Sequence, residues 1–251
     1  MRFLELTLPT PAENLACDEA LLDWAEAEGG EVLRCWEPPA SAVGRRTGEA
    51  SGYFVVVGCG NSVAREVRQS DCERQGVGIF RRCSGGGAVV QGPGCLNYSL
   101  ILQISREPEL AGIPETNRYV MARQQEVTRV GGVDPVAVRG HTDLVVGERK
   151  FSGNAQRRKR RALLFHGTFL CAFDLARLEE FLRPPSREPD YRQGRPHLDF
   201  VTNLGLAPDR LRGALRQVWA AHESLVDWPR AGIAELTASK YARAEWNFKL
   251  P

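Results

Sequence analysis

The sequence predicts a single domain of mixed α/β structure, closer to an α+β arrangement than to regular βαβ alternation. Its 251 residues suit one large domain with a substantial core, and 43% hydrophobic and 25% charged residues are ordinary for a globular protein. Helical and strand-like stretches follow one another irregularly, and no repeat or linker divides the chain. With 33 Lys and Arg against 31 Asp and Glu, the charge balance favours neither a nucleic-acid partner nor an anionic membrane.

The first element is predicted to be a helix that begins after Thr10. Thr10 can cap it, Pro11 fits its first position, and Glu13 can close a capping box. Apolar residues follow at helical spacing until Gly29 and Gly30 end the helix.

The later elements are predicted from apolar runs, alternation and turn residues. Strands are expected at 32–36, 53–57, 87–90, 97–104, 143–146 and 162–171. Helices are expected at 115–130, at 175–183 after a cap at Asp174, and at 208–226. The stretch 184–198, rich in Pro, Arg and Asp, is expected to be an exposed loop.

The apolar runs are too short to span a bilayer, and residues 1–9 lack the features of a secretory signal. A cytoplasmic location away from membranes is therefore expected. The seven cysteines form no CxxC pair and the four histidines lie far apart, which argues against structural zinc. The cysteines are interpreted as reduced thiols, mostly in the core.

The most informative segment is 81–90 (RRCSGGGAVV). Three consecutive glycines between a basic pair and a strand are costly in backbone entropy. They fit a place where main-chain N–H groups approach a ligand, and phosphate is the natural candidate because amides and an arginine fork satisfy its oxygens. The pattern is neither a P-loop nor a dinucleotide-binding loop, and a glycine-rich hairpin without a ligand explains it about equally well.

Two further segments carry positive charge. Residues 148–156 (ERKFSGNAQ) place Lys150 between strands, where its ammonium fits a carboxylate and a phosphate together, although a solvated turn lysine is the commoner case. Residues 157–161 (RRKRR) are more often a solvated loop than a surface that steers an acidic partner or holds phosphates.

Three other side chains have ordinary explanations. His166 lies in a strand-like segment, and a hydrogen-bonded core histidine is expected there rather than a catalytic base. Cys83 and Cys95 flank the glycine motif without an evident base partner, so both are interpreted as unreactive.

Taken together and in order, these segments resemble the lipoate–protein ligase branch of the biotin/lipoate ligase and lipoyl/octanoyl transferase superfamily. The matching segments are 14–21 (NLACDEAL), 81–90, 96–99 (LNYS), 142–145 (TDLV), 149–155 (RKFSGNA), 166–170 (HGTFL), 201–204 (VTNL) and 245–248 (EWNF). The resemblance implies one catalytic domain over residues 1–251. It implies a class II synthetase-like, biotin-ligase-like core, a mixed sheet with helices on one side and the ligand across the sheet.

The resemblance also implies an activity. Family members use ATP and Mg²⁺ to activate lipoate or octanoate as an acyl-adenylate, and then acylate a lysine of a lipoyl-carrier protein, an E2 lipoyl domain or a glycine-cleavage H-like protein. Lys150 is the implied catalytic residue, which would bridge the acyl carbonyl and the α-phosphate. The implied acyl-binding residues are Lys150, Gly153 and His166. The implied ATP and acyl-adenylate site comprises Arg82, Ser84, Gly85, Gly86, Gly87, Ala88, Val89, Val90, Thr142, Asp143 and Lys150, and no protein ligand to a metal is assigned.

The chain departs from the family pattern in three places. Longer ligases continue into a C-terminal domain after EWNF, so no accessory domain is expected here and a separate accessory subunit becomes an open expectation. Thr142 stands where the family has Asn, and the loop between Val146 and Lys150 is short.

Two alternatives remain. An octanoyl/lipoyl transferase acting on an acyl carrier or lipoylated protein needs a thiol nucleophile, and residues 131–149 and 182–185 contain no cysteine. A relay without a thioester stays open. A non-catalytic protein that binds lipoate or lipoyl domains is disfavoured because Lys150 and the 82–90 motif are both retained.

Overall fold

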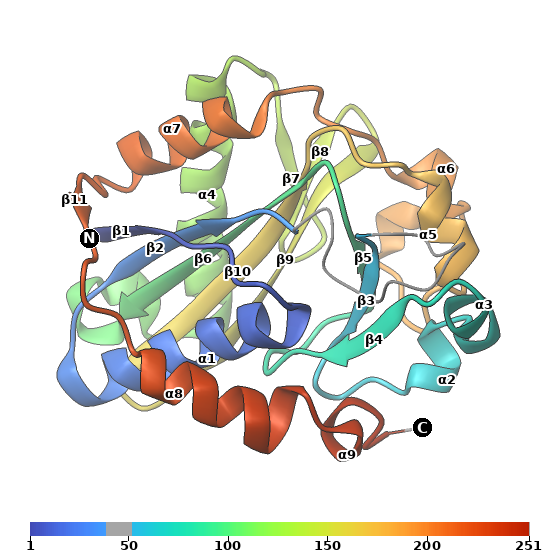
Figure 1. The fold of residues 1–251 in the computed structure, drawn as a ribbon. Helices are drawn as coiled ribbons and strands as arrows, with labels where there is room; N and C mark the ends of the chain where they lie inside the picture. The colour runs from blue at the N-terminus through green and yellow to red at the C-terminus, as the bar shows by residue number, and fades with distance from the viewer. Residues whose placement is uncertain (39–51, 251) are drawn as a thin grey trace.

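Two β-sheets organise the computed structural model, which describes residues 1–38 and 52–250 (Figure 1). In spatial order, the larger sheet of this described part consists of β11 (Glu223–Ser224), β1 (Arg2–Glu5), β2 (Val32–Trp36), β6 (Cys95–Gln103), β10 (Ala162–Leu170), β9 (Arg149–Arg158), β8 (Asp143–Val146) and β7 (Ala137–Arg139). Strand β1 pairs in parallel with β2 and β11, and the other pairs are antiparallel. The smaller sheet consists of β4 (Gly78–Arg81), β3 (Phe54–Val57) and β5 (Val89–Gln91).

Helices lie on both faces of the larger sheet (Figure 1). Helix α1 (Pro11–Glu28) and α8 (Arg230–Leu236) pack on one face, and α4 (Ile113–Gly131) and α7 (Pro208–Val218) on the other. Shorter helices accompany the smaller sheet and the chain end: α2 (Val63–Glu66), α3 (Gln69–Arg74), α5 (Ala176–Phe181), α6 (His197–Phe200) and α9 (Ala244–Asn247). Among the described residues, no helix is both long and apolar enough to cross a membrane.

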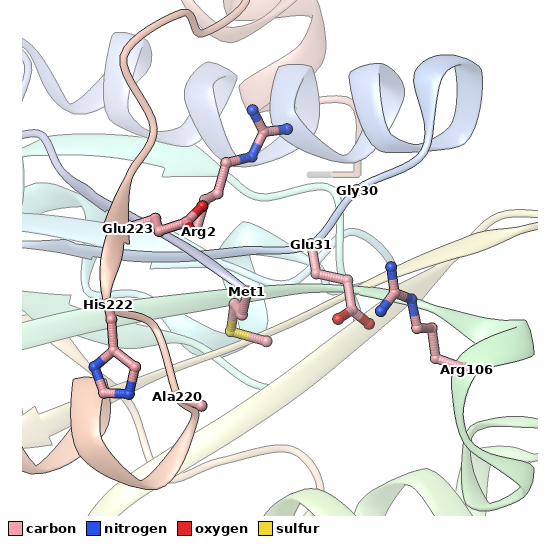
Figure 2. Close-up of a pocket in the computed structure, with 8 residues that line it drawn as sticks. All are labelled: Met1, Arg2, Gly30, Glu31, Arg106, Ala220, His222 and Glu223. Carbon is pink, nitrogen blue, oxygen red and sulfur yellow. The ribbon is translucent and has the colours of Figure 1, made fainter.

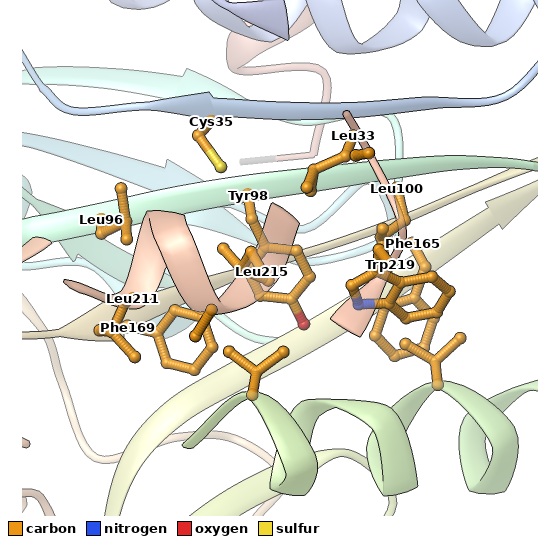
Figure 3. Close-up of a cluster of buried hydrophobic side chains, with 14 of the residues drawn as sticks. Leu33, Cys35, Leu96, Tyr98, Leu100, Phe165, Phe169, Leu211, Leu215 and Trp219 are labelled. Atoms are coloured by element: carbon orange, nitrogen blue, oxygen red, sulfur yellow. The ribbon is translucent and has the colours of Figure 1, made fainter. Parts of the chain in front are cut away.

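The predicted mixed sheet with packed helices is confirmed, but the expectation of helices on one side is wrong. Successive residues of β6, such as Leu100 and Ile101, are apolar and fully buried on opposite faces, so both faces need a cover. Figure 3 shows one of these interfaces, where Tyr98 and Phe165 of the sheet face Leu215 and Trp219.

Helix α1 follows its sequence signals closely. The Thr10 side chain accepts a hydrogen bond from the Glu13 amide (3.2 Å), and the Glu13 carboxylate accepts one from the Thr10 amide (2.9 Å). The expected capping box is therefore present. Gly29, at φ 79°, ends the helix.

Three local predictions need correction. The helix expected at 208–226 ends at Val218, because Ala220 adopts a positive φ of 48° and the chain then enters β11. The stretch 184–198 is mostly exposed, as expected, but it contains a 3₁₀ turn at Asp190–Arg192 with Arg192 buried, and α6 begins at its end. Lys150 lies within β9 rather than between strands, and the first two residues of the basic run belong to the same strand.

Candidate functional site

Two rows of residues cross the larger sheet on the face over which the glycine motif lies. Directly paired residues of antiparallel strands point to the same face. One row is Ala155, His166, Ser99 and Arg34, and the next is Gly153, Thr168, Asn97 and Trp36. This face is therefore polar in the middle of the sheet, and apolar residues farther along the same strands, such as Ile101 and Leu164, pack with α1.

The glycine motif forms an exposed loop on buried supports. Gly85, Gly86 and Gly87 are exposed, while residues 81–84 are buried. Gly86 has φ 90°, in the region that favours glycine. A Cβ on Gly86 would lie 3.8 Å from the Ala155 Cβ, so the loop passes over the polar face at β9.

Arg82 braces this loop from beneath. Its guanidinium donates to the carbonyl oxygens of Gly85 (2.6 Å) and Gly87 (2.9 Å) and to the Ser84 hydroxyl (3.1 Å). Burial lowers the pKa of Arg82 to about 10, so the group stays charged at neutral pH.

The bracing has a consequence for the loop amides. In a trans peptide the N–H points opposite to the C=O, so the N–H groups of Gly86 and Ala88 face away from Arg82. Among the described residues, no hydrogen-bond partner is recorded for the N–H groups of residues 85–88. The loop thus presents exposed donors suited to an anion, and Val89 and Val90 continue it into β5.

Arg81 fixes the base of the loop to the C-terminal segment. Its fully buried guanidinium donates to the carbonyl oxygens of Gly58 (2.9 Å), Asn61 (2.7 Å) and Trp246 (3.1 Å). The Trp246 indole N–H in turn donates to the Arg81 carbonyl (2.8 Å). A Cβ on Gly58 would lie 2.0 Å from the Gly86 oxygen, so only glycine allows the two backbones to approach in this way.

Lys150 and Asp143 form the charged part of the site. Their Nζ and Oδ1 atoms are 2.7 Å apart, and the Tyr191 hydroxyl donates to Asp143 Oδ2 (2.8 Å). The Lys150 side chain is 29% exposed, so it remains within reach of a ligand. A Cβ on Gly153 would lie 2.8 Å from Lys150 Nζ, so the ammonium lies directly over the Gly153 backbone.

Thr142 supports the site indirectly. Its hydroxyl donates to the Asn154 carbonyl (2.8 Å), and the Asn154 amide donates to the Thr142 carbonyl (2.6 Å). Thr142 therefore fastens the chain preceding β8 to β9, next to the Lys150–Asp143 pair.

His166 lies in the middle of the polar face, hydrogen-bonded to Ser84 and Asp18 as a core histidine would be. The structure thus assembles most of the predicted site residues around the glycine loop and β9. Their contacts with nucleotide and acyl group stay predictions.

The remaining predicted features lie elsewhere or have structural partners. Burial raises the pKa of both Cys83 and Cys95 to about 12, which fits unreactive core thiols. In the basic run, Lys159 pairs with Asp23, whereas Arg157 and Arg160 are exposed. Within residues 1–38 and 52–250, no three His, Cys, Asp or Glu residues are grouped closely enough to hold a metal.

A cavity of about 370 Å³ opens at another place, beside β1 and β11 (Figure 2). It is lined by Met1, Arg2, Gly30, Glu31, Arg106, Ala220, His222 and Glu223. Its charged side chains are of both signs, and it includes none of the predicted site residues.

Sequence reasoning missed three residues of the site. Asp18 and Arg34 are charged residues within apolar stretches of α1 and β2, and a charge that must be buried needs a partner. That pattern was a usable signal. Tyr191 comes from a segment interpreted as an exposed loop, and no local pattern points to it.

Comparison with known proteins places the chain in a family. Residues 10–210 match the lipoyl protein ligase A/B catalytic domain. The chain is 26% identical to a lipoate-protein ligase A subunit 1 of Thermoplasma acidophilum, covering 98% of this chain and 96% of that one. It is also 26% identical to an octanoyltransferase LipM of Geobacillus kaustophilus, covering 99% and 98%.

Two solved structures share the fold. A bipartite lipoate protein ligase from T. acidophilum, described with its E2 lipoyl domain, has a TM-score of 0.81 at 24% identity and covers 100% of this chain and 96% of that one. A lipoate-protein ligase A bound with ATP has a TM-score of 0.75 at 23% identity, covering 100% and 99%. The chain therefore belongs to the family of the lipoyl protein ligase A/B catalytic domain.

Proposed function

We propose that this chain is a lipoate–protein ligase that activates lipoate or octanoate with ATP and transfers the acyl group to a lysine of a lipoyl-carrier domain. The observation that carries the proposal is the convergence of two groups on one face of β9. The exposed loop of residues 85–87 lies over Ala155, and the Lys150 ammonium lies over Gly153, two residues earlier on the same face.

This arrangement suits the two charges of an acyl-adenylate. We propose that the loop amides bind phosphate oxygens. The Lys150 ammonium can stabilise the negative charge that develops on the acyl carbonyl and the α-phosphate during adenylation and transfer. Asp143 and Tyr191 hold Lys150 in position before the ligand arrives.

Mg²⁺ belongs to the proposal as the counter-ion of ATP. Asp143 is the carboxylate that contacts Lys150, and it is already paired with that ammonium. We therefore assign no metal cage to the protein and expect the phosphates themselves to supply most of the ligands.

An ATP-independent octanoyltransferase is the second candidate, because an octanoyltransferase relative aligns with nearly the entire chain. That chemistry needs a thiol nucleophile within reach of the site. Six of the seven cysteines are buried. The remaining one, Cys59, is partly exposed and accepts a hydrogen bond from the Lys249 ammonium (3.3 Å).

The experiment compares two donors with the same acceptor. The purified chain is incubated with an apo lipoyl domain and either lipoate, ATP and Mg²⁺, or octanoyl-acyl carrier protein without ATP, and the acceptor is analysed by intact mass. A ligase modifies the acceptor with the first donor only, and Cys59→Ala leaves that activity unchanged. Modification with the second donor, lost in Cys59→Ala, would instead establish the transferase.

A partner subunit is included as an arm of the same experiment. The T. acidophilum structure is described as bipartite and accompanied by its E2 lipoyl domain. We propose that a small accessory subunit assists adenylation by this chain as well. Its addition is expected to speed the reaction that starts from free lipoate and ATP.

A further inference from the structure

A chain of buried hydrogen bonds leads from α1 to Ser84, the residue before the Gly85–Gly87 loop. The Ser84 Oγ lies 2.6 Å from His166 Nε2, and His166 Nδ1 lies 3.0 Å from Asp18 Oδ2. Ser84 and Asp18 are buried, and the His166 side chain is only 12% exposed. Three segments far apart in the sequence therefore meet in one polar cluster.

The other partners of Asp18 fix its charge. Arg34 Nη1 and the Ser99 hydroxyl donate to Asp18 Oδ1 at 2.7 and 2.8 Å. Burial alone would raise the pKa of the Asp18 carboxyl, but the hydrogen bond with His166 and the charge of Arg34 together lower it. Asp18 is thus an ionised acceptor, and the His166 Nδ1 facing it must carry a proton.

The hydrogen-bond partners of Ser84 fix the direction in which its hydroxyl donates. The Ser84 hydroxyl has one proton to donate, and it already accepts from the Arg82 Nε (3.1 Å). The acceptor recorded for that proton among the described residues is His166 Nε2. The hydrogen bonds therefore run in one direction, from Arg82 to Ser84, from Ser84 to His166, and from His166 to Asp18.

The hydrogen bonds among Ser84, His166 and Asp18 are those of a serine–histidine–aspartate triad, but Ser84 is not exposed as a nucleophile would be. A nucleophilic serine must reach its substrate, whereas Ser84 has no exposed surface and is held by the Arg82 guanidinium. Its backbone instead leads directly into exposed Gly85. The cluster is built to hold the loop rather than to attack a substrate.

We propose that Asp18, His166 and Ser84 form a relay that fixes the His166 tautomer and thereby positions the Gly85–Gly87 loop for its ligand. Asp18 sets the proton on Nδ1, which leaves Nε2 free to accept from Ser84. All three are positioning residues. The proposal rests on the proposed function, because the ligand of the loop is taken to be the acyl-adenylate.

The first test is spectroscopic. Nitrogen-15 NMR distinguishes protonated from unprotonated imidazole nitrogens, and His166→Gln identifies the His166 signals among the four histidines. We expect Nδ1–H and bare Nε2 in the wild-type chain. In Asp18→Asn, the side-chain oxygen can keep Arg34 while its NH₂ faces His166, so the proton is expected to move to Nε2. A wild-type Nε2–H tautomer would overturn the proposal.

The second test uses two substitutions of one residue. A glutamine amide reaches about as far as Nε2, so His166→Gln retains an acceptor for Ser84. An asparagine amide reaches about as far as Nδ1, so His166→Asn keeps the hydrogen bond to Asp18 and loses the one from Ser84. We expect His166→Asn and Ser84→Ala to bind a non-hydrolysable lipoyl-AMP analogue about tenfold more weakly, as the loss of one buried hydrogen bond implies. His166→Gln is expected to restore most of the affinity that His166→Asn loses.

Thr116→Val is the matched control. Thr116 is fully buried on α4, and its hydroxyl donates to the Gly112 carbonyl (2.7 Å), so its loss lowers stability without touching the loop. Equal binding by His166→Asn and His166→Gln would overturn the relay. If the wild-type chain does not bind the analogue at all, the proposed function fails, and the nitrogen-15 measurement still decides whether the relay exists.

Discussion

Gly86→Ala separates the shape of the glycine loop from its contact with a ligand. A non-glycine residue at the φ of 90° found here costs about 1–2 kcal/mol. The added Cβ would also lie 2.8 Å from Arg82 Nη2, the atom that donates to Gly85 and Gly87. Displacing that nitrogen forfeits at least one hydrogen bond to a charged group, roughly 1.5–3 kcal/mol. Because the exposed loop can relax in part, we expect a loss of about 2–4 kcal/mol in the free energy of unfolding.

Gly85→Ala is the matched control on the same loop. A Cβ there meets no atom within 4 Å, and Gly85 has no positive φ. Its stability is expected to stay the same or rise by about 0.4–1 kcal/mol, since alanine restricts the unfolded chain. Its affinity for lipoyl-AMP is nevertheless expected to fall, because the methyl group occupies the exposed side of the loop. Urea denaturation without ligand measures the first effect, and titration with the analogue measures the second. Equal stability of the two variants would refute the role assigned to Gly86 and Arg82.

Three further predictions address the catalytic lysine, the buried arginine and a titrating histidine. Lys150→Ala is expected to slow lipoyl transfer by ~10²-fold or more, as for removal of one charge stabiliser, with a melting temperature near that of the wild-type chain; single-turnover kinetics measure it, and a near wild-type rate would contradict the assignment. Arg81→Met is expected to lower the free energy of unfolding by about 3–5 kcal/mol because it leaves buried carbonyl oxygens without donors, whereas the exposed Arg160→Met should change it by less than ~0.5 kcal/mol in the same urea titration. Burial, then the charge of Arg192, lowers the pKa of His197 to about 4, so from about pH 6.5 to 4 the unfolded chain takes up a proton that the folded chain does not. The free energy of unfolding of the wild-type chain should therefore fall by up to ~3 kcal/mol relative to that of His197→Gln over this range, and by nothing above it. Melting temperatures of the two proteins that stay parallel as the pH falls would contradict the assignment.

The elements predicted well from the sequence are those with local signals. Helix α1 carries its cap, its Pro11 and its terminal glycines in the sequence, and all of them act where expected. Strand β9 was missed because its residues 149–158 are mostly small or charged. Its stability comes from pairing with β10 and β8, which only the folded chain supplies.

The residues of the candidate site also divide into those with a local sequence signal and those that only the fold brings together. The residue types of the glycine loop and of Lys150 indicated anion chemistry, and the fold brings them together on β9. The hydrogen-bond partners of the Arg82 guanidinium could not be predicted, because an arginine can donate to a ligand or to nearby backbone carbonyl oxygens equally well. The contact of Asp18 with His166 depends on strand order, which joins residues 148 positions apart.

Transfer from a preformed acyl-adenylate tests the proposed ligase activity most directly. The chain is mixed with a stoichiometric amount of lipoyl-AMP and then with an apo lipoyl domain, and the acceptor is analysed by intact mass in a single turnover. This design bypasses adenylation, so no accessory subunit is needed. We predict that one lipoyl group reaches the acceptor lysine with release of AMP, and that Lys150→Ala slows this step. An unmodified acceptor, with lipoyl-AMP either intact or hydrolysed, would contradict it.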